Sequence, residues 1–186
     1  MFATEVSTLM RIAFSVASFL CGCLAWGATL EKLTIDQMSQ KSTLIVRGRI
    51  NGCTGEQRGS VIYTRCKVAV TERWKGAAAN QVDVLVPGGT ASGLIQMFTG
   101  TPKFNTGGQH VLFLWSGPSG NLQVIGLSQG VFDVKFNGKG ALTAKREATS
   151  EAMLDGGGQP VQDDSIEMTV TALRNRVDRA LAGTSK

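Results

Sequence analysis

The central part of the chain, residues 43–136, is a series of short β-prone runs separated by glycine and proline turn signals. The runs are rich in Val, Ile, Thr, Phe and Tyr, and several alternate apolar with polar residues, as half-buried strands do. Short antiparallel strands at this spacing predict a mainly β fold, closed into a barrel or stacked as a sandwich. The runs cover residues 43–53, 60–76, 81–87, 93–100, 109–115, 122–127 and 131–136.

Two segments outside this region have helical patterns. Residues 33–42 predict a short N-terminal helix with Thr34 as its cap. Near the other end, Asp164 followed three residues later by Glu167 has the spacing of a capping box. We therefore expect an amphipathic helix over residues 164–182 that packs on the β-structure, with a partner-binding helix as the alternative. Its apolar stripe consists of Ile166, Val170, Leu173, Val177 and Leu181.

The first 27 residues have the layout of a secretory signal peptide. Arg11 precedes the apolar run 12–20, and the small-residue box Ala25–Gly27 is suited to cleavage. The run is shorter than the roughly 20 residues that span a bilayer, so we expect no transmembrane anchor after processing. The mature protein is expected in the periplasm or outside the cell. Both Met1 and Met10 are candidate start residues.

A lipoprotein signal is the alternative reading of the same region. The segment Leu20–Cys23 resembles a lipobox, which would leave Cys23 as a lipid-bearing N-terminus. The remaining chain is long enough for one domain with a buried core. We expect a β-barrel domain over residues 28–144, a polar glycine-rich linker over 145–163, and the C-terminal helix thereafter.

The cysteines left after export predict one disulfide. Cys53 and Cys66 flank a turn near Gly59, and two cysteines in an oxidising compartment are expected to pair. Strict alternation along the first strand, however, would turn Cys53 away from its partner. A β-bulge near Gly48 or Gly52 would restore the facing, because strand glycines often mark bulges.

Positive charge is concentrated in the first two long strands. Residues 44–76 carry seven basic and two acidic side chains, a net charge of +5 that equals the net charge of the whole chain. Arg47 and Arg49 share one strand face, as do Arg65 and Lys67. This face suits an anionic glycan, a lipid headgroup or an exported protein. A solvated face that discourages aggregation is the alternative, and export disfavours a nucleic acid partner.

The glycine-rich stretch 86–108 lacks the helix that a phosphate-binding loop needs. Its apolar residues predict a turn, a strand over Leu94–Phe98 and a crossover through Pro102–Phe104. Whether Phe98 and Phe104 point into the core or to solvent is left open by the pattern. We take the candidate contact surface to be the basic pairs together with this region: Arg47, Arg49, Arg65, Lys67, Met97, Phe98 and Phe104.

Catalytic motifs are weak in this chain. Ser128 lies in a G-x-S-x-G segment, but a nucleophile elbow needs a helix after the serine, and a strand is expected here. The single histidine, His110, precedes Ser128, whereas in that fold it follows. Two cysteines and one histidine are too few for a metal site. We expect no cofactor, no metal and no catalytic residue; a hydrolase built on Ser128 is the alternative.

Several segments together resemble a group of uncharacterised exported bacterial proteins. Those proteins share a V-G-R-V strand, a strand ending in K-G, a V-P-G-G turn, a G-x-P-x-F segment and an F-L strand before G-L-x-Q-G. The match covers about Leu33–Val134, and Gly100–Phe104 supplies the G-x-P-x-F element. The corresponding segments here are STLIVRGRI, IYTRCKVAVTERWKG, VDVLVPGG, FNTGGQHVLFL and VIGLSQGVFDV.

The same order of motifs is remotely similar to the netrin-like domain of tissue inhibitors of metalloproteinases, through Ile45–Arg47, Trp74–Gly76 and Gly107–Leu112. The resemblance implies an OB-type, five-stranded barrel flanked by helices. Those inhibitors place an N-terminal cysteine on the zinc of a protease, and the expected mature start, Ala28, supplies none. We therefore expect an exported, non-catalytic binding or accessory module, with a protease-inhibitor-like or protease-associated domain as the alternative.

Overall fold

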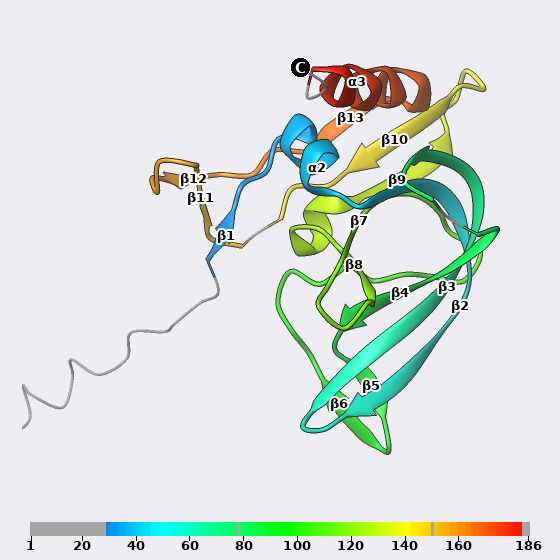
Figure 1. Ribbon diagram of the computed structural model, residues 1–186, viewed down its shortest axis with the longest axis vertical. Coiled ribbons are helices and arrows are strands. Elements are labelled where there is room, and N and C mark those ends of the chain that lie inside the picture. The colour runs from blue at the N-terminus through cyan, green and yellow to red at the C-terminus, as the bar shows by residue number, and fades with distance from the viewer. Residues whose placement is uncertain (1–28, 78, 150, 184–186) are drawn as a thin grey trace, which may run out of the picture.

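The computed structural model describes residues 29–77, 79–149 and 151–183. Its main element is an eight-stranded sheet in the order β13-β10-β9-β7-β2-β3-β4-β8 (Figure 1). The long hairpin of β2 and β3 forms its centre, and β7 pairs antiparallel with both β2 and β9. The strands are β2 (Leu44–Arg58), β3 (Val61–Lys75), β4 (Gln81–Pro87), β7 (Gln109–Ser116), β8 (Leu122–Val124), β9 (Val131–Phe136), β10 (Leu142–Arg146) and β13 (Ile166–Thr169).

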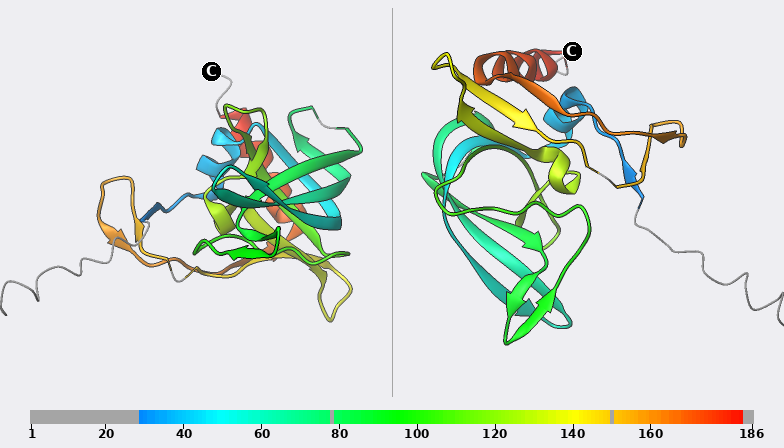
Figure 2. Two further views of the ribbon diagram at one scale, coloured as in Figure 1. Left: turned by 90° about the horizontal axis from the view of Figure 1, so that it is seen from below. Right: turned by 180° about the vertical axis from the view of Figure 1, so that it is seen from behind.

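The sheet returns on itself and is partly closed. Strand β8 pairs antiparallel with β7 and also meets β4 in parallel at Val84 and Leu122. The pairings therefore run in a circuit through β7, β2, β3, β4 and β8, which curls the sheet around one end (Figure 2). The prediction of a mainly β fold with helices on it is confirmed.

The expected disulfide and its bulges are both present. Cys53 and Cys66 face each other across β2 and β3 and are bonded. The register shifts between Arg47 and Gly48 and again between Ile50 and Gly52, so both candidate positions carry an irregularity. At Gly48 a side chain would collide, because an added Cβ would lie 2.6 Å from the Ala69 carbonyl oxygen.

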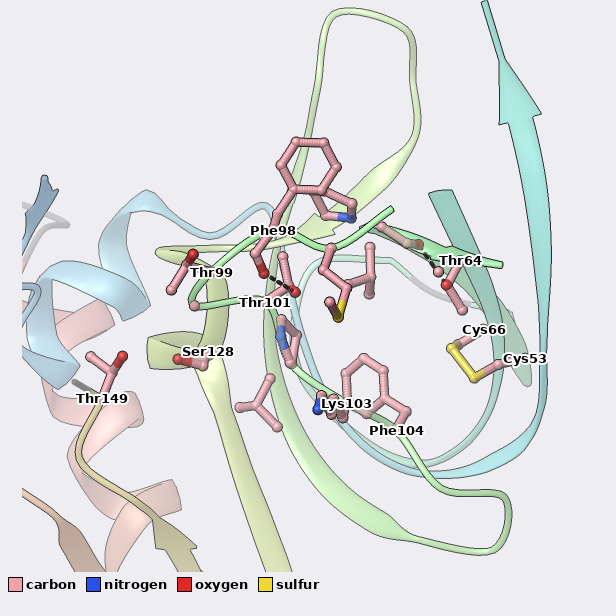
Figure 3. A pocket seen from close by; sticks show the side chains of 18 of the residues that line it. Cys53, Thr64, Cys66, Phe98, Thr99, Thr101, Lys103, Phe104, Ser128 and Thr149 are labelled. Atoms are coloured by element: carbon pink, nitrogen blue, oxygen red, sulfur yellow. Dashed lines mark hydrogen bonds between the residues drawn. A yellow bond between two sulfur atoms is a disulfide. The ribbon is translucent and has the colours of Figure 1, made fainter. Parts of the chain in front are cut away.

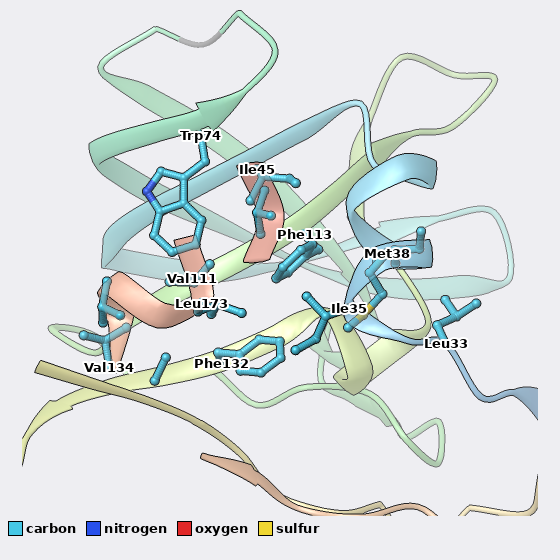
Figure 4. Close-up of a cluster of buried hydrophobic side chains, with 14 residues drawn as sticks. Leu33, Ile35, Met38, Ile45, Trp74, Val111, Phe113, Phe132, Val134 and Leu173 are labelled. Carbon is cyan, nitrogen blue, oxygen red and sulfur yellow. The ribbon is translucent and has the colours of Figure 1, made fainter. Parts of the chain in front are cut away.

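Apolar residues gather on both faces of β7, which is why this strand is almost wholly buried. Val111 and Phe113 belong to a cluster beneath the helices that also contains Phe132 and Leu173 (Figure 4). Alternate residues of β7 face the inside of the partly closed sheet. That inner cluster contains Leu44, Val46, Ile50, Val68, Val84, Val86, Leu112, Leu114 and Val124.

The N-terminal helix forms as predicted. Helix α2 (Ile35–Lys41) begins after Thr34, whose hydroxyl accepts a hydrogen bond from the Gln37 amide at 3.1 Å. The Gln37 side chain accepts one from the Thr34 amide in return, which completes a capping box. At the other end, the Lys75 ammonium donates to the carbonyl of Ser39 at 2.8 Å. Burial lowers the pKa of Lys75.

The predicted start of the C-terminal helix at Asp164 is wrong. Helix α3 (Val170–Ala182) begins after Thr169, which accepts a hydrogen bond from the Ala172 amide. The residues before it form β13, an edge strand paired antiparallel with β10. Pairing with this open edge satisfies the backbone of the segment. Of the predicted stripe, Val170, Leu173 and Val177 are buried, and Ile166 and Leu181 pack against the same cluster.

The segment predicted as a linker contains short strands of its own. Strand β11 (Met153–Leu154) pairs with both β1 (Leu30–Glu31) and β12 (Pro160–Val161) in a three-stranded sheet. Met153 is buried. These residues therefore bring the start of the described chain and the 151–163 segment together.

Three expectations fall on parts of the chain outside the described residues. They are the signal peptide over 1–27, the lipid-bearing Cys23 and the mature start at Ala28. No helix within the described ranges is long and apolar enough to cross a membrane.

Candidate functional site

A hollow of about 960 Å³ lies beside the inner face of the partly closed sheet, and we call it the mouth. One wall is formed by the disulfide, Thr64 and Phe104 (Figure 3). The opposite wall comes from β9, from the end of β10 and from the segment that follows it, including Thr149. Hollows of this size commonly hold ligands.

A small hairpin forms the rim of the mouth. Strand β5 (Gly89–Ala91) pairs antiparallel with β6 (Leu94–Gln96) around a two-residue turn. Gly88, just before the hairpin, and Gly89, its first residue, have φ values of 88° and 127°, which allow the chain to turn sharply out of β4. The hairpin is fixed to β3, because the Ile62 amide donates to Gln96 Oε1 at 2.7 Å.

The rim displays large apolar side chains to solvent. Leu94 is 57% exposed, Ile95 73%, Met97 85% and Phe98 40%. Such a cluster, on one hairpin strand and the two residues that follow it, is unusual for a monomer surface and is typical of a contact site. Phe98 therefore belongs to the surface. Phe104 differs, because it is partly buried against the inner cluster of the sheet.

The predicted contact residues divide into two separate groups. Arg65 and Lys67 alternate along β3 with Thr64 and Cys66, so they lie on the outer sheet face, away from the mouth. Arg65 is bound by Glu56 at 2.9 Å. The basic pair Arg65 and Lys67 and the 97–104 region, predicted as parts of one contact surface, therefore lie on different faces.

Two of the four basic residues are neutralised by neighbouring strands. Arg47 pairs with Glu72 at 2.9 Å, and Arg65 also reaches Asp83 at 3.4 Å. The hydrogen bond from Arg65 is the main cause of the lowered pKa of Glu56. Arg49 and Lys67 are exposed and make no ion pair within the described ranges. Two of the four basic residues predicted as contacts, Arg47 and Arg65, are therefore already paired with carboxylates of the same chain.

His110 lies buried next to the mouth, and its ring contacts the ring of Phe104. The two ring centroids are 5.2 Å apart in a T-shaped arrangement. His110 Nδ1 is 2.9 Å from Asp133 Oδ1, although neither ring nitrogen makes a hydrogen bond of good geometry within the described residues. Burial lowers the pKa of His110, and the attraction of Asp133 offsets only part of this effect.

Acidification is expected to destabilise the protein through His110. Its pKa in the folded state lies below the unfolded value of about 6.5, so the unfolded chain binds more protons between these two values. The contribution of His110 to stability is therefore complete above about pH 6.5 and is lost as the pH falls through the folded pKa. The only histidine of the chain gives one imidazole signal in proton NMR, which reports the folded pKa directly.

Urea unfolding at pH 7.5 and 5.5 measures the consequence of this shift. The wild type is expected to lose stability between the two conditions, and His110→Gln is expected to lose less. The charged groups facing His110 are Asp133, which raises its pKa, and Lys135, which lowers it. An imidazole that titrates above 6.5, or equal losses in the two proteins, would contradict this explanation.

Ser128 lies at the mouth without the surroundings of a nucleophile. It belongs to the 3₁₀ turn η1 (Leu127–Gly130), and a strand, β9, follows directly. The Ser128 amide donates to the Gly100 carbonyl at 3.1 Å, which ties η1 to the rim. Among the described residues, neither nitrogen of His110 hydrogen-bonds with Ser128. The geometry therefore lacks the serine–base contact that activates a nucleophile.

The charges around the mouth nearly balance. Lys103, Lys145 and Arg146 line it together with Asp133, Glu147 and Glu151. Lys145 is paired with Glu147 at 2.7 Å, and Arg146 is paired with the buried Asp163. In the described part of the chain, no three His, Cys, Asp or Glu side chains come together as a metal site requires.

Two structural features of the site have no clear local signal in the sequence. The buried Gln129 side chain accepts from the Leu33 amide and donates to the Glu31 carbonyl, and it links η1 to the start of the described chain. The Arg146–Asp163 pair fixes the far wall of the mouth.

No protein-family model matches the chain, and no curated protein is significantly similar to it. The mouth and its rim therefore define the candidate site.

Proposed function

We propose that the protein is an exported, non-catalytic binding module that holds a segment of another exported protein in its mouth. The circuit of five paired strands supports an OB-type barrel, an architecture that binds ligands on one sheet face and its adjoining loops. A disulfide that links β2 to β3 is the kind of cross-link found in exported proteins.

The observation that carries this proposal is the exposed apolar rim beside a large hollow. Met97 and Phe98 both line the mouth and both face solvent. Covering one such side chain fully contributes about 1.5–3 kcal/mol, which gives a partner a strong reason to bind there. The far wall adds backbone and hydroxyl groups, including Thr149, that can orient a bound segment.

Charge favours a protein segment over an anionic glycan or lipid headgroup. The charges that line the mouth nearly cancel, so the hollow offers no concentrated positive field. Arg47 and Arg65, the half-buried members of the basic face, already bind carboxylates of their own chain. An apolar peptide with a few polar groups matches the mouth better than a polyanion does.

Affinity capture from the exported proteins of the source cells tests this proposal. Wild-type protein is expected to retain a defined partner, and the double variant Met97→Asp, Phe98→Asp is expected to retain at least tenfold less. Two buried contacts of about 1 kcal/mol each would already account for that factor. The variant places negative charge where an apolar surface must be covered.

The matched control is Phe136→Asp, which alters a side chain that is 71% exposed on β9 and does not line the mouth. It is expected to retain the partner as the wild type does. Equal losses in both variants would mean that capture is non-specific, and unchanged retention by the double variant would remove the mouth as the binding site.

A further inference from the structure

The outer edge of β6 carries unused backbone groups. Strand β6 pairs with β5 alone in a two-stranded sheet. In a hairpin with a two-residue turn, the residues flanking the turn exchange both hydrogen bonds, so Leu94 and Gln96 direct their backbone groups toward β5. Ile95 therefore directs its N–H and C=O away from β5, to an edge on which another strand can pair.

This edge lacks the side-chain protection that usually prevents pairing. Natural edge strands are protected by charged side chains, proline, bulges or short length, and of these only short length, three residues, applies to β6. Residues 84–102 contain no charged side chain, and their two prolines, Pro87 and Pro102, lie outside the hairpin. The side chains at the edge are instead Leu94, Ile95 and Met97, all of them exposed.

The occupant that this edge fits is a second copy of the same chain. The chain has a net charge of +5, so two copies repel each other over most of their surfaces. The uncharged hairpin is a region where they can approach without that opposition. Antiparallel pairing centred on Ile95 is self-complementary, because it sets Leu94 of each copy opposite Gln96 of the other.

We propose that the protein forms a two-fold dimer in which the two β6 strands pair antiparallel about Ile95. The two hairpins then make one four-stranded sheet in the order β5-β6-β6-β5. The dimer covers Leu94 and Ile95 of both copies. This proposal goes beyond the proposed function and does not depend on any ligand.

Sedimentation equilibrium of the purified mature protein, without added ligand, tests the dimer. The wild type is expected to pass from monomer to dimer over a concentration range centred on about 10 µM, as a small interface would give. Ile95→Lys is expected to raise the dissociation constant at least tenfold, because it places two lysines opposite each other at the two-fold axis. Phe136→Lys adds the same charge to an equally exposed side chain and is expected to leave the constant unchanged.

A mixing experiment locates the axis. Ile95→Lys and Ile95→Glu are each expected to be monomeric alone, and an equimolar mixture is expected to form a mixed dimer, since opposite charges then face each other. Amide exchange at Ile95 is expected to slow at concentrations where the wild type is dimeric, because its N–H is then paired.

Thermal unfolding shows whether Ile95→Lys remains folded, which an exposed position should allow. A wild type that stays monomeric throughout the range would overturn the dimer. Ile95→Lys that dimerises like the wild type, or a mixture that stays monomeric, would overturn pairing about Ile95. Failure of the ligand proposal would affect none of these measurements, since no ligand is present in them.

Discussion

Replacing Asp163 with alanine is expected to lower the free energy of unfolding by about 3–5 kcal/mol, because it leaves the Arg146 charge buried without its partner. The Asp163 carboxylate receives two hydrogen bonds of 2.7 Å from Arg146. The side chain of Asp163 is 0% exposed and that of Arg146 is 5% exposed. Chemical denaturation of the purified protein at pH 7 measures this loss.

The electrostatics of this pair support the same expectation. Burial alone would raise the pKa of Asp163, but hydrogen bonds from Arg146 and from the Thr149 amide outweigh it, and the pKa is lowered. The stabilisation from this lowered pKa is present above the unfolded value of about 3.9 and is lost as the pH falls through the folded value.

Two further variants distinguish the loss of this buried ion pair from the general effect of shortening a side chain. Lys41→Ala breaks the exposed ion pair with Glu31 and is expected to cost less than about 1 kcal/mol. The double variant Arg146→Met, Asp163→Leu removes both charges and is expected to recover much of the stability lost in Asp163→Ala, since no unpaired charge is left. An Asp163→Ala protein as stable as Lys41→Ala would contradict the structural role given to this pair.

The second large effect is expected from the disulfide. Replacing Cys53 and Cys66 with alanine is expected to lower the free energy of unfolding by about 3 kcal/mol, because the bond closes a loop with a sequence separation of 13 residues. Urea unfolding of the double variant and of reduced wild type should give similar losses. The long β2–β3 pairing on both sides of the bond should keep the fold intact in either case.

Reductant provides the control for this comparison. It is expected to have no effect on the stability of the double variant, which has no bond left to reduce. A wild type that is insensitive to reductant, together with free thiols detected in the native protein, would contradict the assignment of this pair. The same variant also tests the mouth, because both cysteines form part of its wall.

Much of the fold follows from alternation and capping in the sequence. The conflict between strict alternation and the facing of Cys53 predicts a bulge near Gly48 or Gly52, and the register is irregular at both. The Thr34 cap is likewise predicted from residue type and position. These features depend on neighbours in the chain, so local patterns are sufficient to find them.

The errors have a common physical origin in tertiary pairing. Ile166 and Val170 are four residues apart, as on a helix face, while Ile166 and Met168 are two apart, as on a strand face. Local periodicity is compatible with a helix and with a strand. The segment forms a strand because it pairs with the open edge of β10. The start of α3 therefore depends on a neighbour that the local sequence does not identify.

In the candidate site, too, some features follow from the local sequence and others depend on tertiary contacts. Alternation correctly places Arg65 and Lys67 on one face, but the carboxylate of Glu56 reaches Arg65 only through the β2–β3 register. Phe98 and Phe104 lie in a stretch with no period, so their opposite environments depend on where the rim meets the sheet. The sequence identifies both parts of the candidate surface, and the fold shows that they face different directions.

Site-specific photocrosslinking tests the central claim, that the mouth is where the partner binds, most directly. A photoreactive amino acid at Thr99, on the rim of the mouth, is compared with one at Lys67, on the outer basic face. Both side chains are exposed, so neither substitution should disturb the fold. We predict that illumination with exported proteins joins one partner to position 99 and not to position 67, whereas adducts from position 67 alone would contradict the account.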